Sequence, residues 1–286
     1  MVAAPLPAQA QPSKPNGLVK DTECIGFLQW ALPRLGMRWA GFRRVRGQVC
    51  KRLAGRLSIL GVRSLADYRE LLDTDAAEWR QLDGLCRISI SRFYRDQGVW
   101  WYLEQRLLPR LASQALPRGE SRLRIWSAGC ASGEEPYTLA LMFALGAVPP
   151  GWEPEIIATD ADTCLLARAR RACYPPGSLR DLPPAWRAVF LQAGDERCLP
   201  RAYRATVRFL EQDLRRNIPN GGLGLILCRN LVFTYYRESL QAAIALRLAR
   251  ALLPGGFLVL GARESLPEPV SGLVREQPWL YRREPR

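Results

Sequence analysis

The chain has 286 residues, of which 48% are hydrophobic, and it carries a formal net charge of +14 without a single histidine. This length and apolar content suffice for one sizeable domain and a smaller one. No apolar run approaches the roughly 18 residues that a membrane-spanning helix needs, so we expect no membrane insertion. The lack of histidine removes the usual base at neutral pH and the commonest metal ligand. The charge predicts an acidic partner.

Residues 1–20 are rich in Pro, Ala and Gln and lack a basic start, which predicts a disordered tail and no secretory signal. The chain has eight cysteines, scattered and without a C-x-x-C pair: Cys24, Cys50, Cys86, Cys130, Cys164, Cys173, Cys198 and Cys228. We therefore expect reduced thiols in a cytoplasmic protein, with no disulfide framework and no metal site.

A basic segment follows the tail. Between Cys24 and Ala66 there is no acidic residue, whereas nine residues are basic: Arg34, Arg38, Arg43, Arg44, Arg46, Lys51, Arg52, Arg56 and Arg63. Apolar residues recur at spacings of three and four from Phe42 to Leu60, which predicts one amphipathic helix. Arg44 and Lys51 fall on its polar face, and Arg46, Arg52 and Arg56 lie along the flanks. We interpret residues 21–97 as a helical domain with a basic docking face.

A buried strand, a glycine turn and a helix follow one another within residues 123–137. The chain turns at Gly129 and Gly133, where bare backbone lets a ligand come close. The helix then starts with Glu134 and Glu135, which would repel a pyrophosphate. A cationic ligand without phosphate fits better, and S-adenosylmethionine is one. The alternative is a plain strand-to-helix turn.

Acids or amides end three further strand-like runs. Asp160 follows residues 155–159 and is placed to accept hydrogen bonds from ribose hydroxyls, Asp213 follows residues 207–212, and Asn230 follows residues 223–229. Such runs alternate with helical stretches at residues 134–145, 163–172 and 239–252. The alternation predicts an α/β fold with a mostly parallel sheet covered on both faces, and a ligand site at the carboxyl ends of its strands.

Four motifs together make the chain resemble the CheR-type chemotaxis-receptor glutamate methyltransferases. They are SISRFYRD at 89–96, WSAGCASGEEPY at 126–137, ATDAD at 158–162, and CRN at 228–230 with GARES at 261–265. The resemblance covers roughly residues 21 to 283. It implies a Rossmann-like class I methyltransferase sheet of seven strands, the last one antiparallel, within residues 98–286. It also implies a small helical N-terminal domain and a short β-rich insertion at about residues 173–206.

The resemblance also implies a cofactor site for S-adenosylmethionine. Arg95 should reach the methionine carboxylate, and Glu134 should meet the amino group. Asp160 should hold the ribose, and Asp213 with Leu214 should frame the adenine. The complete set of implied cofactor-binding residues is Ser89, Ser91, Arg95, Gly129, Glu134, Asp160, Asp213, Leu214, Arg229 and Asn230.

The implied catalytic residues are Arg95 and a pocket tyrosine. The family reads Cys-Arg-Asn, three residues, then Tyr, but Thr234 holds that place here. The tyrosine is therefore Tyr235, through a local bulge, or Tyr236. The family's Gly-His-Ser-Glu-Ser is changed to Gly-Ala-Arg-Glu-Ser at residues 261–265, in keeping with a chain that lacks histidine.

The implied reaction moves a methyl group from S-adenosylmethionine to a glutamate carboxylate of a chemoreceptor. A carboxylate is already ionised at pH 7, so this transfer needs no histidine base. The Glu-rich methylation helices would dock on the basic face. Two alternatives stay open: the basic face binds RNA and the enzyme methylates RNA or another substrate, or a degenerate cofactor domain acts as a regulatory binder. We expect a monomer.

Overall fold

The computed structural model describes residues 20–115, 119–146, 148 and 151–284, so most of the predicted tail lies outside the described residues. The chain divides into two compact units. The first unit consists of residues up to Leu35 together with Trp39–Arg87. The second unit consists of Gly36–Arg38 and Ile88–Arg286.

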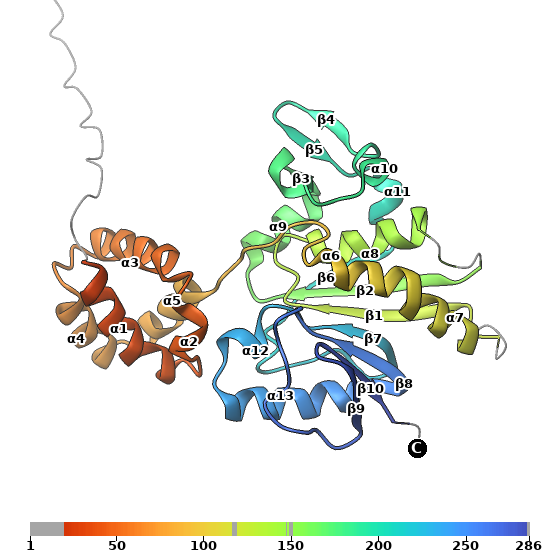
Figure 1. The fold of residues 1–286 in the computed structure, drawn as a ribbon. Coiled ribbons are helices and arrows are strands. Elements are labelled where there is room, and N and C mark those ends of the chain that lie inside the picture. Colours follow the sequence, from red (N-terminus) through yellow and green to blue (C-terminus); the bar gives the residue numbers. More distant parts are fainter. Residues whose placement is uncertain (1–19, 116–118, 147, 149–150, 285–286) are drawn as a thin grey trace, which may run out of the picture. The chain divides into compact units, whose positions relative to one another are not determined.

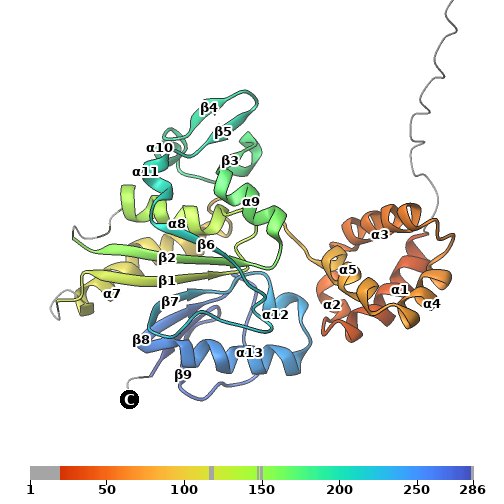
Figure 2. The same ribbon diagram turned by 180° about the vertical axis from the view of Figure 1, so that it is seen from behind.

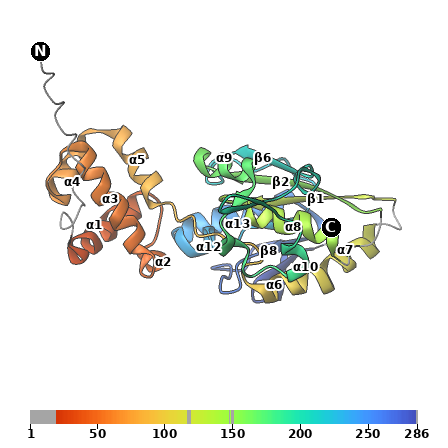
Figure 3. The ribbon, with the colours of Figure 1, turned by 90° about the horizontal axis from the view of Figure 1, so that it is seen from above.

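The described part of the first unit is built from five helices, which Figure 3 shows gathered together. Their apolar stripes meet in a core that includes the fully buried Leu28, Leu53, Leu57 and Tyr68. Ser64 caps the fourth helix by accepting a hydrogen bond from the backbone N–H of Asp67. The helices are α1 (Asp21–Arg34), α2 (Trp39–Phe42), α3 (Arg46–Leu60), α4 (Leu65–Thr74) and α5 (Ala76–Cys86).

The single helix predicted from Phe42 to Leu60 is wrong, because a turn separates α2 from α3 at residues 43–45. The guanidinium of Arg46 donates to the backbone carbonyl of Arg43 at 2.6 Å, a contact that occupies this carbonyl at the break. Arg44 therefore lies in the turn and not on a helix face. The buried stripe itself is confirmed, since Phe42, Val49, Leu53 and Leu57 are fully buried.

Three flanking basic residues of the predicted docking face are held by groups of their own unit. Arg46 pairs with Asp21 at 2.9 Å, and Arg56 pairs with the buried Glu78 at 2.5 Å. Arg52 donates to backbone carbonyls at the end of α5. Only Arg44 and Lys51 of the five named basic residues are classed as exposed.

The second unit contains, within its described residues, a seven-stranded sheet in the order β6-β2-β1-β7-β8-β10-β9 (Figure 1). Strand β10 is antiparallel to both neighbours, and the pairs among β6, β2, β1, β7 and β8 are parallel. The predicted α/β fold with a seven-stranded sheet is confirmed. The strands are β1 (Arg122–Ala128), β2 (Glu153–Asp160), β6 (Val207–Glu211), β7 (Leu223–Leu227), β8 (Leu252–Val259), β9 (Leu273–Gln277) and β10 (Leu280–Arg283).

Helices pack against this sheet through residues that alternate along the strands. Ile125, Leu225 and Leu227 belong to one buried cluster that includes side chains of α6, α7 and α8. The neighbouring Trp126 and Ile226 are equally buried but lie outside that cluster, as expected for a sheet with two covered faces. The helices of the unit are α6 (Gln97–Tyr102), the π-helix η1 (Leu103–Leu107), α7 (Leu108–Ala115), α8 (Glu134–Leu145), α9 (Thr163–Arg171), α12 (Val232–Tyr235) and α13 (Glu238–Ala251).

A small three-stranded sheet, in the order β3-β5-β4, forms an insertion between α9 and β6 (Figure 2). Strand β5 is antiparallel to both neighbours. The elements of the insertion are β3 (Cys173–Tyr174), η3 (Pro176–Leu179), α10 (Pro184–Arg187), β4 (Leu191–Ala193), β5 (Glu196–Cys198) and α11 (Arg201–Arg204).

The expectation of reduced thiols throughout is wrong for four of the eight cysteines. The described residues contain two disulfides, Cys24–Cys50 and Cys173–Cys198. Their partners are 26 and 25 residues apart, with no spacing motif, so only the packing of α1 on α3 and the register of β3 on β5 bring them together. Within the described residues, no helix is long and apolar enough to cross a membrane, and no group of three potential metal ligands occurs.

Candidate active site

The loop after β1 is fastened to the end of β2. The backbone N–H groups of Gly129 and Cys130 both donate to the carbonyl of Thr159, at 2.8 and 2.9 Å. The N–H of Ala131 donates to Oδ2 of Asp160 at 2.9 Å, and the N–H of Asp162 donates to Oδ1 at the same distance. The two carboxylate oxygens of Asp160 thus accept from backbone N–H groups of two loops, which fix the carboxylate at the carboxyl end of β2.

The two glycines of this loop have conformations and surroundings that exclude a side chain. Gly129 has a φ of +75°, and a Cβ on it would lie 2.3 Å from Cδ2 of Leu231. Gly133 has a φ of +91°, and its Cβ would lie 3.1 Å from the hydroxyl of Tyr174. Left-handed backbone of this kind favours glycine, so the loop keeps bare backbone facing its neighbours.

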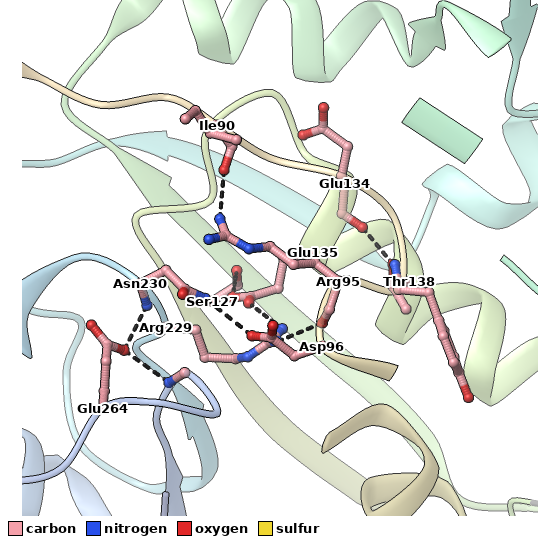
Figure 4. A network of polar contacts seen from close by, with 12 residues as sticks. Ile90, Arg95, Asp96, Ser127, Glu134, Glu135, Thr138, Arg229, Asn230 and Glu264 are labelled. Atoms are coloured by element: carbon pink, nitrogen blue, oxygen red, sulfur yellow. Dashed lines mark hydrogen bonds and ion pairs between the residues drawn. The ribbon is translucent and has the colours of Figure 1, made fainter. Parts of the chain in front are cut away.

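Glu134, the first residue of α8, is only 2% exposed. The Ser132 hydroxyl donates to its Oε1 at 3.3 Å, whereas its buried Oε2 has no hydrogen-bond partner. Burial raises the pKa of this carboxyl, and hydrogen bonds from Ser91 and Ser132 oppose that rise. In Figure 4 the carboxylate points away from the polar network around Arg229. An unsatisfied buried carboxylate oxygen fits a cationic ligand group, as the sequence predicted for this residue.

Arg229 is the centre of a buried polar network (Figure 4). Its Nη1 contacts Oε2 of Glu135 at 3.1 Å, and its Nη2 contacts Oδ2 of Asp96 at 3.0 Å. The same Nη2 donates to the backbone carbonyl of Arg95 at 2.6 Å. Ser127 completes the network by donating to Oε1 of Glu135 at 2.8 Å. These contacts join the motif segment before α6 to the start of α8 and the end of β7.

Asn230 has left-handed backbone, with a φ of +56°. Its N–H donates to Oε2 of Glu264 at 2.6 Å, and the N–H of Gly261 donates to the same oxygen at 2.8 Å. Thr234, which occupies the family's tyrosine position, donates its hydroxyl to Oε1 of Glu264 at 2.5 Å. Glu264 therefore ties the loop after β7 to the loop after β8. Sequence reasoning missed this role, although the residue stands in the quoted GARES motif.

The predicted adenine residues lie after β6. The carboxylate of Asp213 is held by the guanidinium of Arg215, with an ion pair at 2.6 Å, and Leu214 is 4% exposed. The same guanidinium lies 5.9 Å from the ring centroid of Tyr236. Arg215 was not singled out in the sequence, because a residue two positions after a strand-end acid carries no distinctive pattern.

The two candidate tyrosines have different surroundings. Burial raises the pKa of Tyr235, and its hydroxyl feels the charges of Arg95, which opposes the rise, and of Glu264, which adds to it. Tyr236 instead forms a backbone bridge with Met37. The charge of Arg95, from the motif at residues 89–96, thus acts on the hydroxyl of Tyr235.

The side chain of Arg95 turns back on its own segment. Its Nη1 donates to the backbone carbonyl of Ile90 at 2.7 Å, as Figure 4 shows. Ser89 and Ser91, from the same motif, are half-buried, and Ser91 hydrogen-bonds Glu134. The motif segment and the start of α8 therefore meet at this carboxylate.

Comparison with known proteins agrees with this architecture. Residues 89–276 match the family model described as "CheR methyltransferase, SAM binding domain". A chemotaxis protein methyltransferase of Listeria monocytogenes is 32% identical over 76% of this chain and 81% of its own length. A second one, of Salmonella typhimurium, is 31% identical over 81% of this chain and 78% of its own length.

A solved structure is similar at lower identity: the N-methyltransferase NodS of Bradyrhizobium japonicum, with a TM-score of 0.32 and 13% identity over 56% of this chain and 64% of that chain. The fold and the family model define a methyltransferase that uses S-adenosylmethionine. The chain belongs to the CheR methyltransferase family, and the resemblance stated from its motifs is confirmed.

Proposed function

We propose that this protein transfers a methyl group from S-adenosylmethionine to a glutamate side-chain carboxylate of a chemoreceptor cytoplasmic domain. The observation that carries the proposal is the buried Oε2 of Glu134, which lacks a hydrogen-bond partner beside a glycine turn and the strand-end Asp160. The relatives, which are named chemotaxis protein methyltransferases, support this choice of acceptor over RNA.

The residues present fit the cofactor. Glu134 would hold its amino group, Asp160 its ribose, and Asp213 with Leu214 its adenine. Ser89, Ser91 and Arg95 would line the methionine end. Bound S-adenosylmethionine supplies an electrophilic methyl group on its sulfonium. Gly129 allows the left-handed turn of the loop against Leu231, and Arg229 and Asn230 form the floor by positioning the surrounding loops.

The chain's contribution to the reaction is alignment. A glutamate acceptor is ionised at pH 7, so no residue has to remove a proton. Holding two reactants in line can supply on the order of 7–11 kcal/mol of barrier reduction. Tyr235, whose raised pKa keeps it protonated, can donate a hydrogen bond that orients the acceptor carboxylate.

We assign residues 88–286 to the methyltransferase domain, with an insertion at about residues 173–206, and residues 21–87 to a helical docking domain, so that Ser89, Ser91 and Arg95 belong to the domain whose site they line. Docking would be electrostatic, between the basic face and the Glu-rich helices of the acceptor. We also infer a monomeric enzyme that acts in the cytoplasm.

Calorimetry with S-adenosylhomocysteine tests the cofactor site. Asp160→Ala should weaken binding by about 1–3 kcal/mol, because the ribose hydroxyls lose their acceptor. Asp162→Asn is the matched control: it keeps the side-chain cap of α9 and should bind as tightly as the wild type. Binding of NAD or ATP, with no response to S-adenosylhomocysteine, would refute the proposed function.

Two tyrosine variants locate the pocket residue. Tyr235→Phe should lower kcat about tenfold through loss of one orienting hydrogen bond, with little change in acceptor KM. Tyr236→Phe should stay close to the wild type, because this tyrosine is tied to its surroundings by its backbone and ring. Initial rates with labelled cofactor measure both variants, and the reverse order would assign the role to Tyr236.

The docking face is tested by reversing its two exposed charges. Arg44→Glu with Lys51→Glu should raise the acceptor KM and leave cofactor affinity unchanged. Wild-type turnover should also fall with added salt, as the Debye length shrinks from about 10 Å to about 3 Å. Arg250→Glu with Arg275→Glu makes the same change in net charge at exposed positions of the other unit and should leave KM unaltered. An equal rise in KM for both pairs would contradict a docking role for Arg44 and Lys51.

A further inference from the structure

The Cys173–Cys198 disulfide joins the first strand of the insertion to its central strand. Strand β3 has two residues, and its pairing with β5 consists of Cys173 opposite Cys198 and Tyr174 opposite Arg197. The Cα atoms of the two cysteines are 4.0 Å apart. The bond therefore adds a covalent link to a pairing of only two residues on each strand.

Tyr174, the residue after Cys173, reaches from this strand to the cofactor loop. Its ring is fully buried, and its hydroxyl donates to the backbone carbonyl of Ser132 at 2.7 Å. Gly133, which stands between Ser132 and Glu134, also lies against this hydroxyl, since a Cβ on Gly133 would meet it at 3.1 Å. Phe93, from the motif segment before α6, packs edge-on against the ring, with centroids 4.8 Å apart. Tyr174 thus supports the turn that carries the carboxylate proposed to bind the cofactor.

The two disulfides differ in how well a reductant can reach them. Cys173 and Cys198 are both half-buried, whereas in the other disulfide Cys50 is half-buried and Cys24 is completely buried. Thiol–disulfide exchange requires a thiolate to reach a sulfur atom, and Cys173–Cys198 offers two partly exposed cysteines where Cys24–Cys50 offers one. Strand β3 also lies outside the seven-stranded sheet, so opening the bond leaves the pairing of that sheet intact.

We propose that the Cys173–Cys198 disulfide is a reversible redox site that controls the rigidity of the loop formed by residues 129–135, and through it the affinity for the cofactor. The effect on cofactor affinity rests on the proposed function. A dithiol reductant attacks one sulfur and forms a mixed disulfide, and its second thiol then displaces the protein thiol. The products are two protein thiols and one oxidised dithiol, and an organic disulfide reverses the reaction.

Hydrogen–deuterium exchange on the full chain without cofactor tests whether the disulfide controls the rigidity of the loop. Differential alkylation identifies the redox state, because Cys164 is the one exposed free cysteine among the described residues, and Cys173 and Cys198 become reactive only on reduction. The peptide covering residues 129–137 should exchange faster in the reduced wild type. Cys24→Ser, which removes the other disulfide, should keep this response. Cys173→Ser should exchange fast in both conditions.

Calorimetry with S-adenosylhomocysteine tests whether the redox state controls the affinity for the cofactor. Reduction should raise the Kd about three- to tenfold, in keeping with the loss of one well-formed hydrogen bond. The proposal would be overturned if deuterium exchange stayed unchanged in samples in which alkylation shows that Cys173–Cys198 is completely reduced. A response to reductant that persists in Cys173→Ser would also overturn it. The wild-type comparison decides the matter even if that variant does not fold. If neither redox form binds S-adenosylhomocysteine, the proposed function fails, whereas the exchange data still decide the redox site.

Discussion

Glu134→Gln is expected to remove most of the affinity for S-adenosylhomocysteine and, at the same time, to stabilise the protein without ligand. The loss of a charge-assisted hydrogen bond to the ligand's amino group should weaken binding by about 1.5–3 kcal/mol. Calorimetry at pH 7 measures this change. Glu153→Gln, at an exposed carboxylate at the start of β2, is the control and should change neither property.

The stabilising effect follows from the sign of the pKa shift. Burial raises the pKa of Glu134 in the folded protein above its ordinary value of 4.5. Between these two pKa values the folded state binds more protons than the unfolded state, so stability without ligand falls as pH rises through that window. The loss of stability is complete above the raised pKa. A glutamine side chain does not ionise, so Glu134→Gln does not lose this stability. Thermal unfolding should therefore give a higher Tm for Glu134→Gln at neutral pH.

The same shift predicts how binding depends on pH. The amino group of the ligand favours the ionised carboxylate, so wild-type affinity should decrease as pH falls through the raised pKa. Glu134→Gln should bind weakly and show no such dependence. A variant that kept wild-type affinity and pH dependence would place the amino group elsewhere.

Arg229→Ala is expected to be the most destabilising single substitution in the site. The Arg229 side chain is 3% exposed and contacts Glu135 and Asp96. Its removal leaves the largely buried carboxylate of Glu135, whose side chain is 15% exposed, without its cation, and breaking a buried pair typically costs about 3–5 kcal/mol. Chemical denaturation without ligand measures the change in unfolding free energy.

Two further variants distinguish the destabilisation caused by the stranded Glu135 charge from that caused by removing any arginine. Arg124→Ala breaks a half-exposed pair with Glu155 and should cost only about 0–1 kcal/mol. Adding Glu135→Gln to Arg229→Ala should recover part of the lost stability, because the stranded charge is then gone. If Arg229→Ala cost no more than Arg124→Ala, the network of Figure 4 would not be a stabilising element.

The sequence predicted the large sheet well, because local patterns and the sheet topology agree. The helix expected at residues 134–145 is α8, Asp160 is the last residue of β2, and Asn230 follows β7. Parallel strands with their carboxyl ends at one edge bring such residues together regardless of the rest of the fold.

Contacts that depend on tertiary packing could not be predicted in this way. Glu264 binds backbone groups of two loops, and nothing in the spacing of its motif shows which N–H groups it will meet. The disulfides form between cysteines that only the packed helices and the small sheet bring together. The break between α2 and α3 falls where the guanidinium of Arg46 donates to the backbone carbonyl of Arg43, and an apolar repeat contains no information on such a contact.

Methyl transfer to glutamate can be tested by labelling with methyl-tritiated S-adenosylmethionine. The protein would be incubated with a Glu-rich chemoreceptor cytoplasmic fragment and with excess structured RNA in the same reaction. We expect base-labile label on the fragment, as a methyl ester requires, and loss of that label when the methylated glutamates are replaced by alanine. Base-stable label on the RNA, with none on the fragment, would contradict the assignment.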